Sequence, residues 1–125
     1  MKYVTLGKTG LSVAAVSFGG IPIQRADAEN TKKIVDKLEE YGMNYIDTAR
    51  GYTVSEEYLG RALKGRRDKF YLATKSMARD YESMKKDIQT SLNNLQTDYI
   101  DVYQLHNIKV SDFDLVFETK NESLC

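Results

Sequence analysis

Cysteine, surplus charge of either sign and long apolar runs are scarce or missing in this 125-residue sequence. The single cysteine, Cys125, is the last residue, so one thiol excludes an internal disulfide and a cysteine-ligated metal cluster within the chain. Lysine and arginine number 18, and aspartate and glutamate also number 18. A balanced charge does not indicate a nucleic-acid partner or an anionic membrane surface.

The amino-terminal residues, "MKYVTLGKTGLSV", lack the continuous apolar segment of a signal peptide. No stretch approaches the ~20 apolar residues that a helix needs to cross a bilayer. Hydrophobic residues make up 42% of the chain and charged residues 29%, a composition typical of a folded domain. We therefore expect a cytoplasmic protein that binds neither membranes nor nucleic acid.

Strand and helix patterns alternate along the chain after a short hairpin. Gly7 and Gly10 bracket a tight "GKTG" turn between the two strands of that hairpin. Spaced apolar residues predict three helices, over residues 27–41, 55–63 and 81–95. Asp27 and Ser55 are the expected N-caps of the first two helices. Apolar and β-branched runs predict four strands, over residues 13–18, 44–46, 69–75 and 98–107.

This alternation predicts a parallel sheet with right-handed crossovers. Two architectures fit, a doubly wound sheet and part of a (β/α)8 barrel. No Gly-x-Gly-x-x-Gly follows the first strand, which disfavours the dinucleotide-binding version of the doubly wound sheet. In the barrel alternative, the amino-terminal hairpin would close the bottom of the barrel.

Four side chains able to carry protons lie at the ends of successive predicted strands. Asp47 follows the second strand, Tyr52 lies in the next loop, Lys75 ends the third strand and His106 lies near the end of the fourth. Taken singly, each has a structural explanation as a cap, a packing ring, a solvated lysine or a buried imidazole. Because the carboxyl ends of parallel strands meet at one rim, their joint occurrence predicts a site there.

These residue types suit the reduction of a carbonyl group. Hydride addition leaves an alkoxide that needs a proton, and a tyrosine is a poor acid near neutrality because its ordinary pKa is ~10. A neighbouring ammonium stabilises the phenolate, and an aspartate holds that ammonium charged and oriented. A histidine can donate a hydrogen bond to the substrate carbonyl.

Four stretches together resemble the aldo-keto reductases, in the order and spacing of that family: "YVTLGKTGLSVAAVSFGG", "YIDTARGY", "SEEYLGRALKGRRDKFYLATK" and "SLNNLQTDYIDVYQLHN". The resemblance implies that Asp47, Tyr52, Lys75 and His106 form the family's catalytic tetrad. It also implies a nicotinamide cofactor, NADP(H) or NAD(H), and a small-molecule carbonyl substrate.

The same resemblance implies cofactor contacts near the nicotinamide ribose, from Gly20, Ile21 and Asp47. The stretch "FGGIPIQR" is similar to a bacterial and archaeal branch whose longer members carry a carboxyl-terminal iron-sulfur region. Because Cys125 is the only cysteine, we expect no iron-sulfur cluster and no other metal site in this chain.

The resemblance spans residues 2–110, whereas a complete barrel typically has ~250 residues. We therefore expect an α/β fold that is the N-terminal half of a (β/α)8 TIM barrel, with an N-terminal β-hairpin. Residues 1–110 would form the partial barrel, with strands one to four and helices one to three. Residues 111–125 would form a short tail that does not match the family. Most of the family's cofactor pocket belongs to strands five to eight.

Three functions follow as hypotheses. The leading one is a truncated aldo-keto reductase, an NAD(P)H-dependent oxidoreductase by family, that has little or no activity as this chain alone. The alternative is a non-catalytic half-barrel that binds or self-assembles, for example as a homodimer through its open sheet edges. A lyase or isomerase that needs no nicotinamide is the third, and the tyrosine-lysine-aspartate set favours it least.

Overall fold

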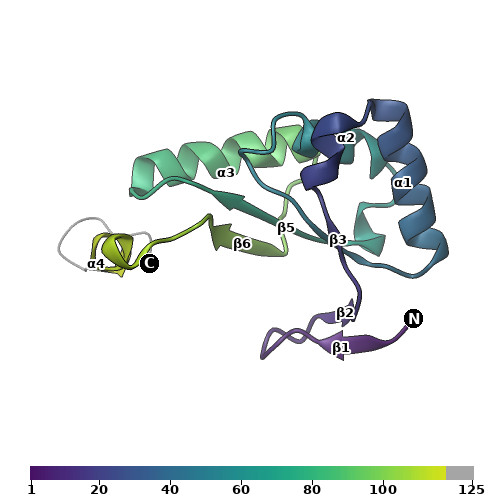
Figure 1. The fold of residues 1–125 in the computed structure, drawn as a ribbon, viewed down its shortest axis with the longest axis horizontal. Helices are drawn as coiled ribbons and strands as arrows, with labels where there is room; N and C mark the ends of the chain where they lie inside the picture. Colours follow the sequence, from purple (N-terminus) through teal and green to yellow (C-terminus); the bar gives the residue numbers. More distant parts are fainter. Residues whose placement is uncertain (118–125) are drawn as a thin grey trace.

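Residues 1–117 are described by the structure, a computed structural model in which strands and helices alternate (Figure 1). The strands are β1 (Tyr3–Thr5), β2 (Ser12–Ala14), β3 (Phe18–Gly19), β4 (Tyr45–Asp47), β5 (Tyr71–Ser76) and β6 (Val102–Leu105). The α-helices are α1 (Ala28–Glu40), α2 (Ser55–Ala62), α3 (Tyr81–Leu95) and α4 (Val110–Phe117). Two 3-10 helices, η1 (Ile21–Arg25) and η2 (Arg67–Lys69), lie between them.

Strands β3 to β6 form one parallel sheet in the order of the chain, so β3 and β6 are its edges. Helices α1, α2 and α3 cover one face of this sheet and leave the other face uncovered (Figure 1). The register places Asp47 beside Ala73 and Lys75 beside Gln104. A single-layer parallel sheet with its helices on one side is the arrangement of half a (β/α)8 barrel, as predicted.

The hydrophobic core lies between the sheet and the helices. It contains the following buried side chains: Ile23, Val35, Leu38, Ile46, Leu59, Ala62, Leu63, Phe70, Leu72 and Leu95. Full burial of one of the leucine, isoleucine, valine or phenylalanine side chains contributes about 1.5–3 kcal/mol to folding. Since side chains alternate along a strand, burying Ile46 in this core turns its neighbour Asp47 toward the uncovered face.

The amino-terminal hairpin packs at the amino end of the sheet, as the barrel hypothesis expected. Asn44, which precedes β4, accepts a hydrogen bond from the Ala14 backbone N–H (2.8 Å) and donates one to the Ser12 carbonyl (3.0 Å). The Tyr3 hydroxyl donates to the Gly42 carbonyl (2.9 Å). The hairpin therefore lies at the opposite end of the strands from the predicted rim.

Helix starts are only partly as predicted. The Asp27 carboxylate accepts a hydrogen bond from the Asn30 N–H (2.7 Å), which confirms this residue as the N-cap of α1. The prediction for Ser55 was wrong, because Val54 is the N-cap of α2 and makes no side-chain cap bond. The Ser55 hydroxyl instead bonds the Thr48 hydroxyl (2.8 Å) and the Gly20 carbonyl (3.1 Å).

Two predicted strands were too long. Residues 13–18 belong to two different sheets, because β2 ends at Ala14, the chain then bends, and β3 begins at Phe18. The strand expected over residues 98–107 begins only at Val102. Directly before this strand, the Asp101 carboxylate accepts a hydrogen bond from the Leu72 N–H of β5 (2.9 Å) and pairs with Arg67 (2.7 Å). A side chain therefore binds a backbone N–H that a regular strand would bind with a carbonyl group.

The sheet is followed by α4, which occupies the first part of the predicted tail. The rest of the predicted tail, residues 118–125 with Cys125, lies outside the described residues. Within residues 1–117, no helix is long and apolar enough to cross a membrane. The same residues contain no group of three or more metal-ligating side chains placed to hold an ion.

Candidate active site

Lys75 is the centre of the rim that the sequence predicted. Its ammonium Nζ lies 2.8 Å from Asp47 Oδ2 and 2.7 Å from the Thr48 carbonyl oxygen. The lysine side chain is 10% exposed and the aspartate side chain 36%. A buried ammonium needs such partners, because an unpaired buried charge is costly. The carboxylate at the end of β4 therefore fixes the lysine of β5.

Tyr52 and His106 adjoin this ion pair. The Lys75 Nζ lies 5.3 Å from the centroid of the Tyr52 ring. The Tyr52 and His106 rings meet edge to face, with centroids 5.6 Å apart and an interplanar angle of 88°. All four residues predicted for the rim thus come together on the uncovered side of the sheet. The hydrogen bonds of the Lys75 ammonium go to Asp47 and to the Thr48 carbonyl, and the Tyr52 ring lies next to this ion pair.

Gln104 is a member of this cluster that the sequence did not single out. It lies beside Lys75 in the register of β5 and β6, and its amide Nε2 donates to Asp47 Oδ1 (3.3 Å). The two oxygens of the Asp47 carboxylate therefore have different partners, an ammonium and an amide. Strand alternation carried the signal, because Gln104 shares the face of His106 two residues later.

Arg79, which follows β5, binds the backbone of His106. The His106 N–H donates to the Ser76 carbonyl (2.8 Å), and its own carbonyl accepts a bond from Arg79 Nη2 (2.6 Å). The same guanidinium lies 3.3 Å from the Asp112 carboxylate of α4. The pKa of Asp112 lies below its ordinary value of 3.8, mainly because its carboxylate accepts a hydrogen bond from the Lys109 N–H. The hydrogen bond from Arg79 lowers this pKa further. The imidazole Nδ1 is buried and has no hydrogen-bond partner within residues 1–117.

The residues predicted near a nicotinamide border the same rim. Gly20 donates its N–H to the Asp47 carbonyl (2.7 Å). A Cβ at this position would lie 3.0 Å from the hydroxyl oxygens of Thr48 and Ser55, so a larger residue is disfavoured. Next to it, the Ile21 side chain is 57% exposed and provides an apolar surface. The constraint at Gly20 is therefore internal packing, whereas Ile21 is open to a ligand.

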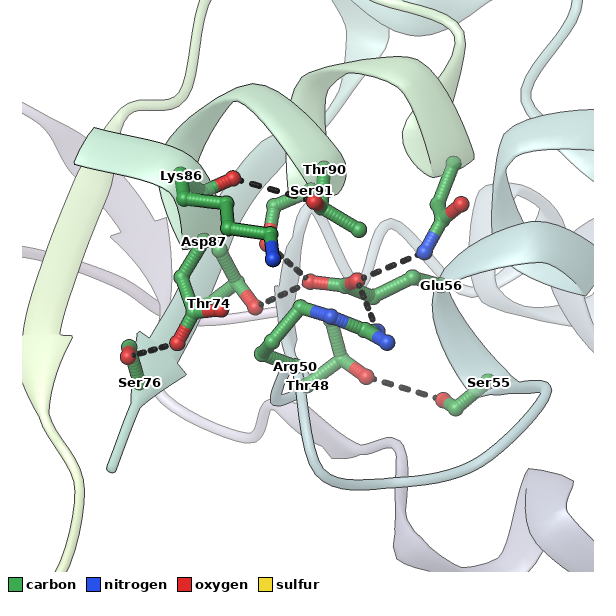
Figure 2. Close-up of polar contacts among 11 residues, drawn as sticks. Thr48, Arg50, Ser55, Glu56, Thr74, Ser76, Lys86, Asp87, Thr90 and Ser91 are labelled. Atoms are coloured by element: carbon green, nitrogen blue, oxygen red, sulfur yellow. Dashed lines mark hydrogen bonds and ion pairs between the residues drawn. The ribbon is translucent and has the colours of Figure 1, made fainter. Parts of the chain in front are cut away.

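The residues that flank Lys75 on β5 are anchored on the opposite, helix-facing side of the strand (Figure 2). Thr74 donates to Glu56 of α2 (2.8 Å), and Ser76 donates to Asp87 of α3. Both β5 side chains are fully buried. The position of Lys75 is therefore set from both faces of its strand.

Comparisons with known proteins agree with this geometry. The model of the Aldo/keto reductase family matches residues 15–118. L-galactose dehydrogenase of Arabidopsis thaliana is 36% identical over 133 residues, covering 91% of this chain and 41% of that enzyme. Methylglyoxal reductase of Yersinia pestis is 37% identical over 90 residues, covering 70% of this chain and 32% of that enzyme.

The holo structure of an aldo-keto reductase from Bacillus halodurans superposes with a TM-score of 0.77 and 39% identity, covering 90% of this chain and 40% of that one. The chain thus spans between 32% and 41% of the length of these three proteins. The chain belongs to the aldo/keto reductase family, and it folds as the N-terminal half of a (β/α)8 barrel with a β-hairpin at its start.

Proposed function

We propose that this chain carries the proton-handling side of an NAD(P)H-dependent carbonyl reductase, with Asp47, Tyr52, Lys75 and His106 as its catalytic residues. The observation that carries the proposal is the Lys75 ammonium, which lies 2.8 Å from Asp47 and 5.3 Å from the Tyr52 ring centroid. His106 meets the same ring edge to face. A buried ammonium between a carboxylate and a phenol has a clear chemical use in reduction.

Each residue has a role in the proposed reaction. The Tyr52 hydroxyl donates a proton to the oxygen of the carbonyl as negative charge develops there. Lys75 stabilises the resulting phenolate, and Asp47 keeps the ammonium in place. His106 donates a hydrogen bond that fixes the carbonyl oxygen beside Tyr52. A bound nicotinamide would supply the hydride.

Gly20, Ile21 and Asp47 are the residues that we propose to border the nicotinamide. The exposed Ile21 side chain and the Gly20 backbone bond to the Asp47 carbonyl support this role. Both NADPH and NADH are compatible with these contacts. Two similar proteins are named as enzymes of small molecules, L-galactose and methylglyoxal. We therefore propose a small aldehyde, ketone or sugar as the substrate.

We further propose that the 125-residue chain alone turns over slowly or not at all. Fast hydride transfer needs both reactants held within reaction distance. Residues 1–117 surround the rim from one side, because the sheet has an uncovered face and two free edges. A cofactor bound there would be held loosely.

The test is a joined protein in which residues 1–117 are followed by the part of the Bacillus halodurans protein that this chain does not cover. We expect it to oxidise NADPH in the presence of methylglyoxal. Tyr52→Phe should lower the rate by about 10²–10⁴-fold, the usual contribution of a general acid. The decrease in NADPH absorbance measures both rates.

Tyr41→Phe is the matched control, because this ring is 60% exposed and lies at the end of α1. It should leave the rate unchanged. If Tyr52→Phe were as active as the parent protein, Tyr52 would not be the proton donor and the proposal would be wrong.

A non-catalytic assembly module is the second candidate, and the free edges β3 and β6 favour it. Tyr71, Ile100 and Val102 are half-buried within residues 1–117, and strand alternation places Tyr71 and Val102 on the same face as Lys75 and Gln104. Pairing with a second copy would cover that face and satisfy the edge strands.

A further inference from the structure

Glu56 accepts four side-chain hydrogen bonds, more than any other carboxylate within residues 1–117, and nothing in the proposed chemistry uses it directly. It lies in the first turn of α2, is 1% exposed and faces the back of the sheet. Its Oε1 accepts hydrogen bonds from Thr74 (2.8 Å) and Ser91 (2.6 Å). Its Oε2 accepts from Arg50 (3.0 Å) and Asn94 (3.2 Å), as Figure 2 shows in part.

Arg50 links this buried carboxylate to the loop that carries Tyr52. The arginine lies two residues before the tyrosine, and its side chain is 31% exposed. The backbone N–H of Arg50 donates to the Lys75 carbonyl (2.9 Å). Arg50 is also the only cationic partner of Glu56 within residues 1–117. One residue therefore contacts Glu56 with its side chain and the Lys75 backbone with its own backbone.

The Tyr52 loop needs such a closure because its backbone is strained. Thr53, directly after the tyrosine, has φ +42°, a region that β-branched residues rarely occupy. Two side-chain pairs close the loop at its base, Thr48 with Ser55 and Arg50 with Glu56. Without them, the strain at Thr53 would favour a different loop conformation.

Glu56 also reaches the strand that carries Lys75. Its partner Thr74 is the preceding residue on β5, with its side chain on the opposite face of the strand. The same carboxylate therefore fixes the lysine strand through Thr74 and the tyrosine loop through Arg50. Two parts of the site that are separate in sequence share a single anchor.

We propose that Glu56, acting through Arg50, is a positioning residue that sets where Tyr52 lies relative to Lys75 and His106. This inference rests on the proposed function for its catalytic meaning. Its geometric content, however, can be measured in the chain without any turnover.

The probe is His106, the only histidine of the chain. Its imidazole gives a single set of NMR signals after isotope labelling of histidine. Because the Tyr52 ring lies 5.6 Å away and edge to face, its ring current acts on those signals. A displaced tyrosine changes the imidazole shifts, even if the rest of the fold is intact.

Two substitutions break the anchor in different ways. In Glu56→Gln, an acceptor remains for Thr74 and Ser91, while the amide nitrogen opposes the Arg50 donor. Arg50→Gln removes the cation from a partly exposed position and leaves the Glu56 carboxylate with its three neutral donors, Thr74, Ser91 and Asn94. We expect both variants to shift the His106 signals in the same direction. The double variant should shift them no further, because both act through one contact.

Glu57→Gln, a neighbouring exposed carboxylate, is the matched control and should leave the His106 signals unchanged. A lower melting temperature with unchanged His106 signals in the variants would show a merely structural role and overturn the proposal. If Glu56→Gln does not fold, Arg50→Gln decides alone by the same criterion. Absence of turnover in the joined protein would overturn the proposed function and leave this measurement unaffected.

Discussion

Tyr103 places a phenol on the helix-facing side of β6, beside Thr74. Its buried hydroxyl has no hydrogen-bond partner within residues 1–117. Burial, with the negative charge of Asp87 as the second cause, raises the pKa of Tyr103 from 10.0 to about 12. The folded protein thus keeps this phenol protonated at a pH where the unfolded chain releases the proton.

The sign of the pH effect follows from that difference. Stability from the protonated phenol is fully present below pH 10 and is lost as the pH rises toward 12, since the unfolded state then binds fewer protons. We expect Tyr103→Phe to be at least as stable as the parent at pH 8, because it removes an unpaired polar group. Between pH 8 and pH 11 it should lose less stability than the parent.

Urea unfolding at the two pH values measures this. The pKa of Tyr45 is also raised, by burial and then by Asp47, so some alkaline loss remains in the variant. The exposed Tyr99→Phe is the control and should behave as the parent. Equal alkaline losses in Tyr103→Phe and the parent would contradict the expected pKa.

The four catalytic candidates were predictable because parallel strands place their carboxyl ends together, so three strand ends and one loop sufficed. Glu56 was not predictable in this way. An acidic residue in the first turn of a helix is ordinary, since it interacts favourably with the helix dipole. Its partners Thr74, Ser91 and Asn94 lie 18 to 38 residues away, and only the folded chain shows that they converge.

The contact between α2 and α3 depends on one glycine. A Cβ on Gly60 would overlap the Asn94 carbonyl oxygen and lie 2.9 Å from the Leu95 Cα. Gly60→Ala therefore forces the helices apart, and overpacking of this kind costs typically about 1–3 kcal/mol. The better helix propensity of alanine offsets at most about 1 kcal/mol of that cost.

Thermal unfolding checks this prediction. We expect a lower melting temperature for Gly60→Ala, and shifts in the positions of Ser91 and Asn94 relative to Glu56. Gly19→Ala is the control, because a Cβ there meets nothing within 4 Å. A Gly60→Ala variant as stable as the parent would show that the helices do not approach as closely as described.

At the level of elements, helices were easier to predict than strands. Helix α3 spans the predicted residues 81–95, because its apolar positions and the capping Asp80 act within one segment. The strand predicted over residues 13–18 divides between two sheets, and its first part is bound by Asn44, a residue far along the chain. Ser55 failed as a cap for the same reason, since its hydroxyl has distant partners.

At the scale of the molecule, residues 1–117 present two free sheet edges and an uncovered sheet face. Several large apolar side chains of α4 are also exposed, namely Val110, Phe113, Leu115 and Phe117. Free edge strands and apolar patches favour association with another chain. We expect light scattering on the purified 125-residue protein to give a mass above the 14.3 kDa of one copy. A monodisperse monomer that melts cooperatively would contradict this expectation.

The central claim is that Tyr52 and Lys75 act as one proton-donating unit on this half of the barrel. The most direct measurement compares Tyr52→Phe, Lys75→Met and the double variant in single-turnover reduction by the joined protein. Residues that act as a unit are strongly non-additive. We predict that the double variant is no slower than the slower single variant. Losses that multiply, or a Tyr52→Phe protein at full speed, would contradict the account.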